Sequence, residues 1–255
     1  MHINLSGNIA LVTGSSGGIG RAVALRLARS GAKVALNYLN SKEAAEEAVA
    51  EIRSFGGEAY AFRADVTHVE QAEALVADVE KAFGGPVTIL VNNAGHLVER
   101  LANAEMTEEL YNKVMDVNMK STVFMSKAVI PGMKAAGQGR IVNMTSVAAH
   151  NGGGPGASIY AASKAAVLSY TKGLAKELAS SGVNVNAVSP GFIGQTAFHA
   201  TFTPDEARIA TIKGIPLGRE GTPDDVAGSV LFLVSELSSY LTGETIEING
   251  GMFMR

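Results

Sequence analysis

Short apolar runs alternate with longer amphipathic stretches along the chain. We predict strands in seven of the runs, at residues 9–13, 33–37, 59–63, 87–91, 140–145, 183–188 and 245–248. The first six strands are each followed by a helical pattern, at residues 21–29, 40–55, 69–83, 108–136, 159–179 and 224–233. The fourth pattern contains Pro131, where we expect an interruption because proline has no amide hydrogen to donate. Regular alternation of strand and helix is typical of a parallel sheet with helices on both faces.

Few of the predicted strands alternate polar and apolar residues, which is expected when a strand is buried on both faces. The linkers are mostly short, and no repeat or low-complexity segment divides the chain. We therefore predict one α/β domain over residues 1–255. The longest irregular stretch, residues 192–221, is where we expect a substrate lid, because loops of that length usually have a function.

Composition narrows the possible functions. Hydrophobic residues make up 47 % of the chain and charged residues 18 %, a balance that argues against disorder. A net charge of −3 disfavours nucleic-acid and anionic-membrane partners. The chain has no cysteine, which excludes a disulfide framework and a cysteine nucleophile. We see neither a signal peptide nor an apolar run long enough to span a membrane, and expect a soluble, cytoplasmic protein. The five histidines are scattered, so no metal site is predicted.

The 29 glycines among 255 residues exceed ordinary usage of roughly 7 %. Several stand between the first strand and the first helix, in a loop that contains Gly14, Ser16, Gly18, Ile19 and Gly20. Such a loop lets the backbone approach a ligand, and the following helix N-terminus favours a pyrophosphate. The same residues also match the G-x-S-x-G elbow of serine hydrolases, but that elbow needs an earlier strand to supply an oxyanion-hole amide. We therefore favour a dinucleotide site.

The end of the second strand bears on the choice of dinucleotide. A carboxylate there usually binds the adenosine ribose, but this chain has Asn37, Asn40 and Ser41 in that region. Amide, hydroxyl and helix-start N–H groups can bind a 2′-phosphate, which an acid would repel. We expect NADP(H) to be favoured over NAD(H), although Asn40 and Ser41 also fit an ordinary helix cap. Asp65, after the third strand, is a candidate acceptor for the adenine amino group.

Tyr160 and Lys164 lie one turn apart at the start of a predicted helix, and Ser146 follows a predicted strand. A cation beside a tyrosine favours the phenolate and lowers the tyrosine pKa. The pair could then exchange a proton with a carbonyl or alcohol oxygen. Ser146 could hydrogen-bond the same oxygen, because ligands of open α/β sheets bind at the carboxyl ends of the strands.

These segments together resemble the short-chain dehydrogenase/reductase family along the whole chain. The matching segments are residues 13–20, Asp65 with Val66, residues 92–95, Asn118, Ser146, Tyr160 with Lys164, and Pro190 with Gly191. The resemblance implies a Rossmann-type, doubly wound sheet of seven parallel strands in one domain. It further implies hydride transfer between NAD(P)(H) and a carbonyl or secondary alcohol without a metal, and a homotetramer or homodimer.

The resemblance also implies roles for individual residues. Tyr160 would be the general acid and base, Lys164 would hold the nicotinamide ribose, Ser146 would orient the substrate oxygen, and Asn118 would hold a water of the proton relay. The other expected cofactor contacts are Val66, Asn92, Ala94, Gly95, Pro190, Gly191 and Ile193. The chain departs from the family at Gly17, where an arginine often meets the 2′-phosphate. It departs again at Gln195, where a threonine is common; Thr196 follows.

The substrate is less constrained. The run from Thr242 to Met254 is most similar to 3-oxoacyl-(acyl-carrier-protein) reductases, but two positions that often hold carrier-binding arginines are Gly137 and Ser181. Lys134 and Arg140 are nearby and could replace part of that patch. Polar residues are expected near the substrate, namely His96, His150, Asn151, Gln195 and His199. We therefore favour a small polar carbonyl compound, such as a sugar or hydroxy acid, over a carrier-linked acyl chain. A dinucleotide-binding regulator without catalysis is a remoter alternative, because Ser146, Tyr160 and Lys164 are all present.

Overall fold

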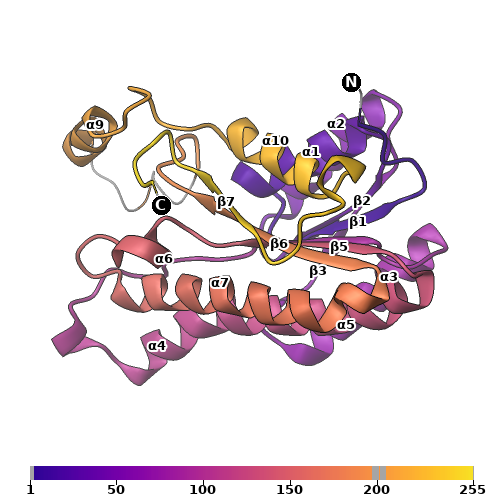
Figure 1. The fold of residues 1–255 in the computed structure, drawn as a ribbon, viewed down its shortest axis with the longest axis horizontal. Coiled ribbons are helices and arrows are strands. Elements are labelled where there is room, and N and C mark those ends of the chain that lie inside the picture. The colour runs from indigo at the N-terminus through magenta and orange to yellow at the C-terminus, as the bar shows by residue number, and fades with distance from the viewer. Residues whose placement is uncertain (1–2, 197–200, 202–204, 255) are drawn as a thin grey trace.

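A parallel sheet of seven strands forms the centre of the protein (Figure 1). The computed structural model describes residues 3–196, 201 and 205–254. The strands are β1 (Ile9–Val12), β2 (Lys33–Tyr38), β3 (Ala59–Arg63), β4 (Ile89–Asn92), β5 (Gly139–Met144), β6 (Val183–Pro190) and β7 (Thr245–Ile248). Their order in space is β3-β2-β1-β4-β5-β6-β7, and every neighbouring pair is parallel. The chain thus leaves the centre in one direction, returns after β3 and continues in the other, which opens a crevice at the carboxyl ends of the strands.

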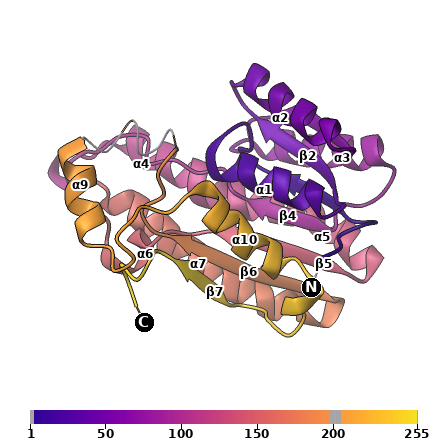
Figure 2. The ribbon, with the colours of Figure 1, turned by 90° about the horizontal axis from the view of Figure 1, so that it is seen from above.

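Helices cover both faces of this sheet (Figures 1 and 2). On one face lie α1 (Gly18–Arg29), α2 (Lys42–Ser54) and α10 (Pro223–Leu233); on the other lie α3 (Val69–Phe83), α5 (Ser121–Ala136) and α7 (Ser158–Leu178). The shorter elements are α4 (Glu108–Met115), α6 (Ala148–Asn151), α9 (Asp205–Lys213), η1 (Asn103–Glu105), η2 (Asp116–Lys120), η3 (Ala179–Ser181) and η4 (Glu236–Ser238). The predicted Rossmann-type fold is confirmed.

Successive side chains of each strand point to opposite faces of the sheet, and both faces are buried, so the strands read as continuous apolar runs. Val12 and Val91 point into the core under α1 and α10, whereas their neighbours Leu11 and Leu90 pack against the helices of the opposite face. All four side chains are completely buried. Burying a Val or Leu side chain contributes roughly 1.5–3 kcal/mol, so both helical layers are held to the same strands.

Local sequence sets the helix ends. Thr222 and Asp225 form a reciprocal capping box at the start of α10, with Pro223 in the first helical turn. Gly84 ends α3 with φ 75°, a left-handed conformation that costs glycine little. These signals explain why the predicted helices lie within a few residues of the observed ones.

The expected interruption at Pro131 is wrong. α5 continues through Pro131 to Ala136, because the proline lies on the exposed side while Val129 and Met133 on either side of it are completely buried. The break occurs earlier, where the five residues of η2 form a π-helical turn between α4 and α5. Turns of this kind are frequent at functional sites.

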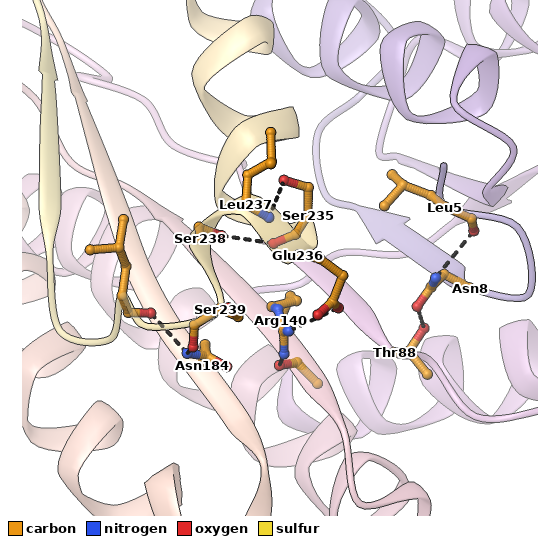
Figure 3. A network of polar contacts seen from close by, with 12 residues as sticks. Leu5, Asn8, Thr88, Arg140, Asn184, Ser235, Glu236, Leu237, Ser238 and Ser239 are labelled. Atoms are coloured by element: carbon orange, nitrogen blue, oxygen red, sulfur yellow. Dashed lines mark hydrogen bonds and ion pairs between the residues drawn. The ribbon is translucent and has the colours of Figure 1, made fainter. Parts of the chain in front are cut away.

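Polar contacts close the amino-terminal edge of the sheet (Figure 3). Thr88 donates to Asn8 Oδ1 at 3.0 Å, just before β4. Arg140 in β5 pairs with Glu236 of η4 at 3.3 Å, and Asn184 in β6 donates to the Ser239 carbonyl at 3.2 Å. The loops at this edge are therefore bonded to the strand ends, and the cavity described next lies at the other edge.

Candidate active site

A cavity of about 890 Å³ lies at the carboxyl ends of the strands. Its size is toward the upper end of the roughly 300–1,000 Å³ usual for ligand sites. Predicted site residues that line it are Gly14, Ser16, Gly18, Ile19, Gly20, Ser41, Gly95, His96, Ser146, Asn151, Tyr160, Lys164, Pro190, Gly191 and Ile193. The structure thus brings together residues that are up to 179 positions apart in sequence, from Gly14 to Ile193.

The glycine positions leave the space that a dinucleotide needs. A Cβ on Gly14 would lie 3.1 Å from the Ala94 backbone, and Gly14 has a positive φ of 60°. A Cβ on Gly95 would lie 2.7 Å from Asn118 Oδ1 and 2.8 Å from Lys164 Nζ. Larger residues at either position would push the glycine loop away from β4 or displace Lys164. The cradle therefore fits a pyrophosphate at α1 and a nicotinamide riboside toward Lys164.

α7 supplies the two reactive side chains. Tyr160 is in its first turn, and Lys164 follows one turn later with its Nζ 5.8 Å from the centre of the Tyr160 ring. Lys164 is 3 % exposed and donates to the Met144 carbonyl at 2.9 Å, at the end of β5. Ser146 follows β5 directly, and its side chain hydrogen-bonds to Tyr160. The end of β5 and the start of α7 thus form one polar cluster.

Burial is the largest influence on the pKa values of Tyr160 and Lys164. It raises the pKa of Tyr160, and the hydrogen bond from Ser146 only partly opposes that effect. It lowers the pKa of Lys164 to about 8, because a buried ammonium loses its hydration. We expected Lys164 to pull the Tyr160 pKa below its ordinary value; in this structure the Tyr160 pKa is instead raised, because desolvation outweighs the neighbouring groups.

Asn118 lies in the π turn and is completely buried. Its Nδ2 donates to the carbonyls of His96 and Val114 at 2.7 and 2.8 Å, and its Oδ1 accepts from the His96 amide at 3.1 Å. The amide is thus bonded to backbone on both sides. These contacts make Asn118 a positioning residue for the segment that begins at Gly95, whereas the predicted contact with a relay water stays a prediction.

Comparison with known proteins accounts for this arrangement. A family model described as enoyl-(acyl carrier protein) reductase matches residues 14–253. The chain belongs to the short-chain dehydrogenase/reductase family. A 3-oxoacyl-(acyl-carrier-protein) reductase from Staphylococcus epidermidis is 42 % identical over 245 residues, which cover 96 % of this chain and 98 % of the relative. The same enzyme from Vibrio cholerae is 43 % identical over 252 residues, covering 99 % and 100 %.

Solved structures give the same family. One described as an NAD(P)-dependent gluconate 5-dehydrogenase from Beutenbergia cavernae, with NADP bound at low occupancy, is 36 % identical with a TM-score of 0.91 over 99 % of both chains. Another, described as a short-chain alcohol dehydrogenase from Sinorhizobium meliloti, is 34 % identical with a TM-score of 0.93, covering 99 % of this chain and 98 % of the other. This short-chain dehydrogenase/reductase is an NAD(P)-dependent oxidoreductase that acts on CH–OH and C=O groups.

Several residues that were expected to touch the cofactor have other contacts in this short-chain dehydrogenase/reductase. Asn37 is 2 % exposed and does not line the cavity. Its Oδ1 accepts from the Gly14 amide at 3.2 Å, and its Nδ2 donates to the Ala64 carbonyl at 3.1 Å. The side chain therefore links the glycine loop to the residue that follows β3.

Asp65 is likewise occupied within its own turn. Its Oδ1 accepts from the Thr67 amide at 2.9 Å and from the Thr67 hydroxyl at 2.6 Å, and its Oδ2 lies 3.3 Å from His68 Nδ1. Partial burial raises the pKa of Asp65, but the bonds from Thr67 and His68 outweigh it, and the net shift is downward. The carboxylate starts the turn into α3, and its expected contact with the adenine amino group stays a prediction.

Four further expected cofactor contacts, Asn40, Val66, Asn92 and Ala94, also lie outside the cavity lining. Val66 packs in the core against α3, and Ala94 supports the glycine loop at Gly14. Asn92 is 3 % exposed and donates to Asn143 Oδ1 at 2.9 Å between β4 and β5. Val66, Ala94 and Asn92 thus help to hold the strand ends that carry the site.

Two expected substrate residues are placed differently. His150 pairs with Glu247 at 3.0 Å and stacks on Phe253 at 4.8 Å, which ties α6 to the end of the chain. Gln195 has a positive φ of 57° and lines a separate hollow between α1 and α10, whereas Thr196 lines the main cavity. Thr196, the residue after this left-handed position, is therefore the threonine that lies at the cavity. His199 and part of the expected lid over residues 192–221 lie outside the described residues.

Sequence reasoning missed two arginines. Arg100 lines the cavity, and Arg63 at the end of β3 donates through Nε to the Leu39 carbonyl at 3.2 Å. Arg100 follows residues 92–95 closely and could have been found by searching for charge after that segment. Arg63 is close to the β2–α2 loop because its strand pairs with β2, a contact that only the strand order reveals. Among the described residues, no cluster of three or more His, Cys, Asp or Glu could hold a metal ion, and no described helix is long and apolar enough to cross a bilayer.

Proposed function

We propose that this chain is an NADP(H)-dependent oxidoreductase that interconverts a ketone and a secondary alcohol on a small polar substrate. Tyr160 exchanges the proton with the substrate oxygen, and Ser146 donates a second hydrogen bond to that oxygen. Lys164 holds the nicotinamide ribose. The observation that carries the proposal is the convergence of these three side chains on one cavity beside the glycine loop.

The groups divide the chemistry between them. A bound nicotinamide supplies or accepts the hydride. Carbonyl reduction leaves an alkoxide, which a protonated Tyr160 neutralises, and burial keeps Tyr160 protonated by raising its pKa. In the oxidative direction the Tyr160 phenolate accepts the proton of the alcohol hydroxyl, and the Lys164 ammonium 5.8 Å from the ring stabilises the phenolate before that transfer. Ser146, which accepts from the Ala148 amide at 3.1 Å, is held in place to orient the substrate oxygen.

Preference for NADP(H) is supported by cations at the β2–α2 loop. Arg63 contacts the Leu39 carbonyl there, and Lys42 begins α2. In the described part of the chain neither forms an ion pair, whereas Arg21 of α1 is paired with Glu51 at 3.0 Å. Ser41 lines the cavity, and its hydroxyl does not cap α2. Neither cation lines the cavity, but both lie beside the loop that carries Ser41, and the end of β2 has no carboxylate to repel a 2′-phosphate.

A small polar substrate is supported by the lining near Ser146, which includes His96, Arg100 and Asn151. The His96 Nδ1 accepts from the Val98 amide at 2.8 Å, and burial lowers its pKa. The neutral ring therefore carries its proton on Nε2.

Reduction of a carrier-linked 3-oxoacyl group is the second candidate, favoured by the names of the curated relatives. Against it, Gly137 and Ser181 stand just before β5 and β6 at the two positions where carrier-binding arginines were expected, and the nearby Arg140 is engaged by Glu236. Sugars, hydroxy acids and 3-oxoacyl thioesters assayed side by side with NADPH and NADP⁺ distinguish the two candidates. We also retain a homotetramer or homodimer as a proposal.

The Tyr160→Phe variant tests the assignment of the chemistry. We expect turnover to fall at least about a hundredfold, the usual contribution of a positioned acid or base, while NADPH binding stays within about twofold. Turnover is followed by absorbance and binding by NADPH fluorescence. A variant that keeps its turnover would show that Tyr160 is not the proton donor.

A further inference from the structure

Among the residues that the structure describes, the charged side chains that line the cavity are all positive. The described residues that line it include no Asp or Glu and two permanent or near-permanent cations, Lys164 and Arg100. Lys164 is bonded to the Met144 carbonyl and belongs to the reaction centre. Arg100 is a second positive charge that the proposed chemistry does not use.

Arg100 is held by its surroundings. Its Nη1 donates to the Pro155 carbonyl at 3.0 Å, and the neighbouring Leu101 amide donates to the Gly156 carbonyl at 3.1 Å. A Cβ on Gly154 would lie 3.4 Å from Arg100 Nη1, and one on Gly156 would lie 3.1 Å from the Arg100 carbonyl carbon. The glycines of this loop therefore let the backbone close around the arginine.

The backbone that leads to Arg100 adopts an unusual conformation. Val98 has a φ of 68°, which is rare for a β-branched residue because its side chain crowds the backbone. The bond from the Val98 amide to His96 Nδ1 accompanies this turn. Such conformations occur mostly where function constrains the chain, and here the turn places His96 and Arg100 on the same cavity.

One of the five guanidinium donors has a protein partner, and in the described part of the chain no acid pairs with Arg100. A planar fork of this kind matches a carboxylate, which it can bind through two parallel hydrogen bonds. We propose that Arg100 binds a carboxylate of the substrate, so that the enzyme acts on hydroxy or oxo acids of the sugar-acid type. This inference rests on the proposed function, since it assigns the two ends of one substrate: the reacting oxygen at Tyr160 and Ser146, and the carboxylate at Arg100.

The test compares acids with neutral partners of the same length. Wild-type holoenzyme is assayed with NADP⁺ on gluconate, galactonate and 3-hydroxybutyrate, each beside its methyl ester, and with NADPH on 3-oxobutyryl thioesters of coenzyme A and N-acetylcysteamine. Binding of gluconate and tartrate to the NADP⁺ complex is measured by calorimetry. The same series is run on Arg100→Met, Arg100→Lys and Arg29→Met. Arg29 is an exposed arginine outside the cavity, so Arg29→Met removes the same charge from another place and serves as the control.

We expect at least one acid to exceed its ester at least tenfold in kcat/KM. That preference should disappear in Arg100→Met because the KM of the acid rises more than that of the ester. It should return in part in Arg100→Lys and persist in Arg29→Met. Carboxylate binding should weaken at least tenfold in Arg100→Met. A thermal unfolding curve that matches wild type shows that a variant is folded. If Arg100→Met does not fold, the comparison is made with Arg100→Lys instead.

Three results would overturn the inference. The first is no preference for acid over ester together with no carboxylate binding by wild type. The second is an equal loss for acid and ester in Arg100→Met, which indicates a structural role. The third is an Arg100-dependent preference for the coenzyme A thioester over the N-acetylcysteamine thioester, which assigns Arg100 to a carrier phosphate. Failure of the proposed function is separate, because it appears as turnover that survives in Tyr160→Phe.

Discussion

The Asn37→Ala variant tests whether Asn37 supports the glycine loop or contacts the cofactor. The substitution removes the acceptor of the Gly14 amide and the donor to the Ala64 carbonyl, at 3.2 and 3.1 Å. Both lost bonds come from a side chain that is only 2 % exposed. Two longer bonds of 3.4 Å, to the carbonyls of Tyr38 and Phe62, disappear with it.

The size of the effect follows from these contacts. A buried donor or acceptor that loses its partner costs roughly 1–3 kcal/mol. Two such groups lose their partners, and the bond to the Gly14 amide is only partly buried. We therefore expect a loss of about 2–4 kcal/mol in the free energy of unfolding, in the lower part of the range for two groups. At about 2–4 °C per kcal/mol for a chain of this size, Tm should fall by about 4–16 °C.

The assay is thermal unfolding of the cofactor-free protein, followed by the KM for NADPH. Asn40→Ala is the matched control, because Asn40 is an exposed asparagine in the same segment and should change the unfolding free energy by no more than about 0.5 kcal/mol. An Asn37→Ala protein with wild-type Tm and a raised KM for NADPH would refute the reasoning and restore Asn37 as a cofactor contact.

Two further predictions concern charge. Arg63→Met should raise the KM for NADPH about tenfold, since a bond to a charged group contributes roughly 1.5–3 kcal/mol. The KM for NADH should stay unchanged. Steady-state kinetics with both cofactors checks this, and an equal effect on both KM values would show that Arg63 does not act through the 2′-phosphate. Lys164→Met should raise the Tm of the cofactor-free protein most near pH 7, because burial lowers the pKa of Lys164 to about 8. Between about pH 8 and the ordinary lysine value the unfolded chain binds more protons than the folded one, so wild-type stability rises with pH and the Tm gap should close. A gap that is constant or widens from pH 7 to pH 10 contradicts this sign.

The fold was readable from the sequence because local and global signals agree in it. Apolar runs such as that of β1 are buried on both faces, and ends such as Gly84 carry their own stop signals. The prediction at Pro131 was wrong because α5 continues through an exposed proline, and the exposure of that residue depends on how the helix packs.

The sequence predicted the site residues whose type itself has a chemical role in the reaction. It did not predict the role of residues whose function depends on which neighbours they contact in the fold. Ser146, Tyr160 and Lys164 were expected together and do line one cavity. Asn37, Asp65 and His150 have suitable side chains at suitable places, but each is occupied by neighbours that the sequence does not reveal. Arg63 belongs to β3, and only the pairing of β3 with β2 carries it to Leu39.

The bonds that join residues 100 and 101 to residues 155 and 156 have a consequence for redesign. Two loops that are 55 positions apart share one backbone pairing, from Leu101 to Gly156, and one side-chain bond, from Arg100 to Pro155. Replacing either loop alone with that of a relative would leave the other without its partner. Specificity should therefore be exchanged by grafting both loops as a single cassette, while the bonded amino-terminal edge of the sheet keeps the scaffold intact.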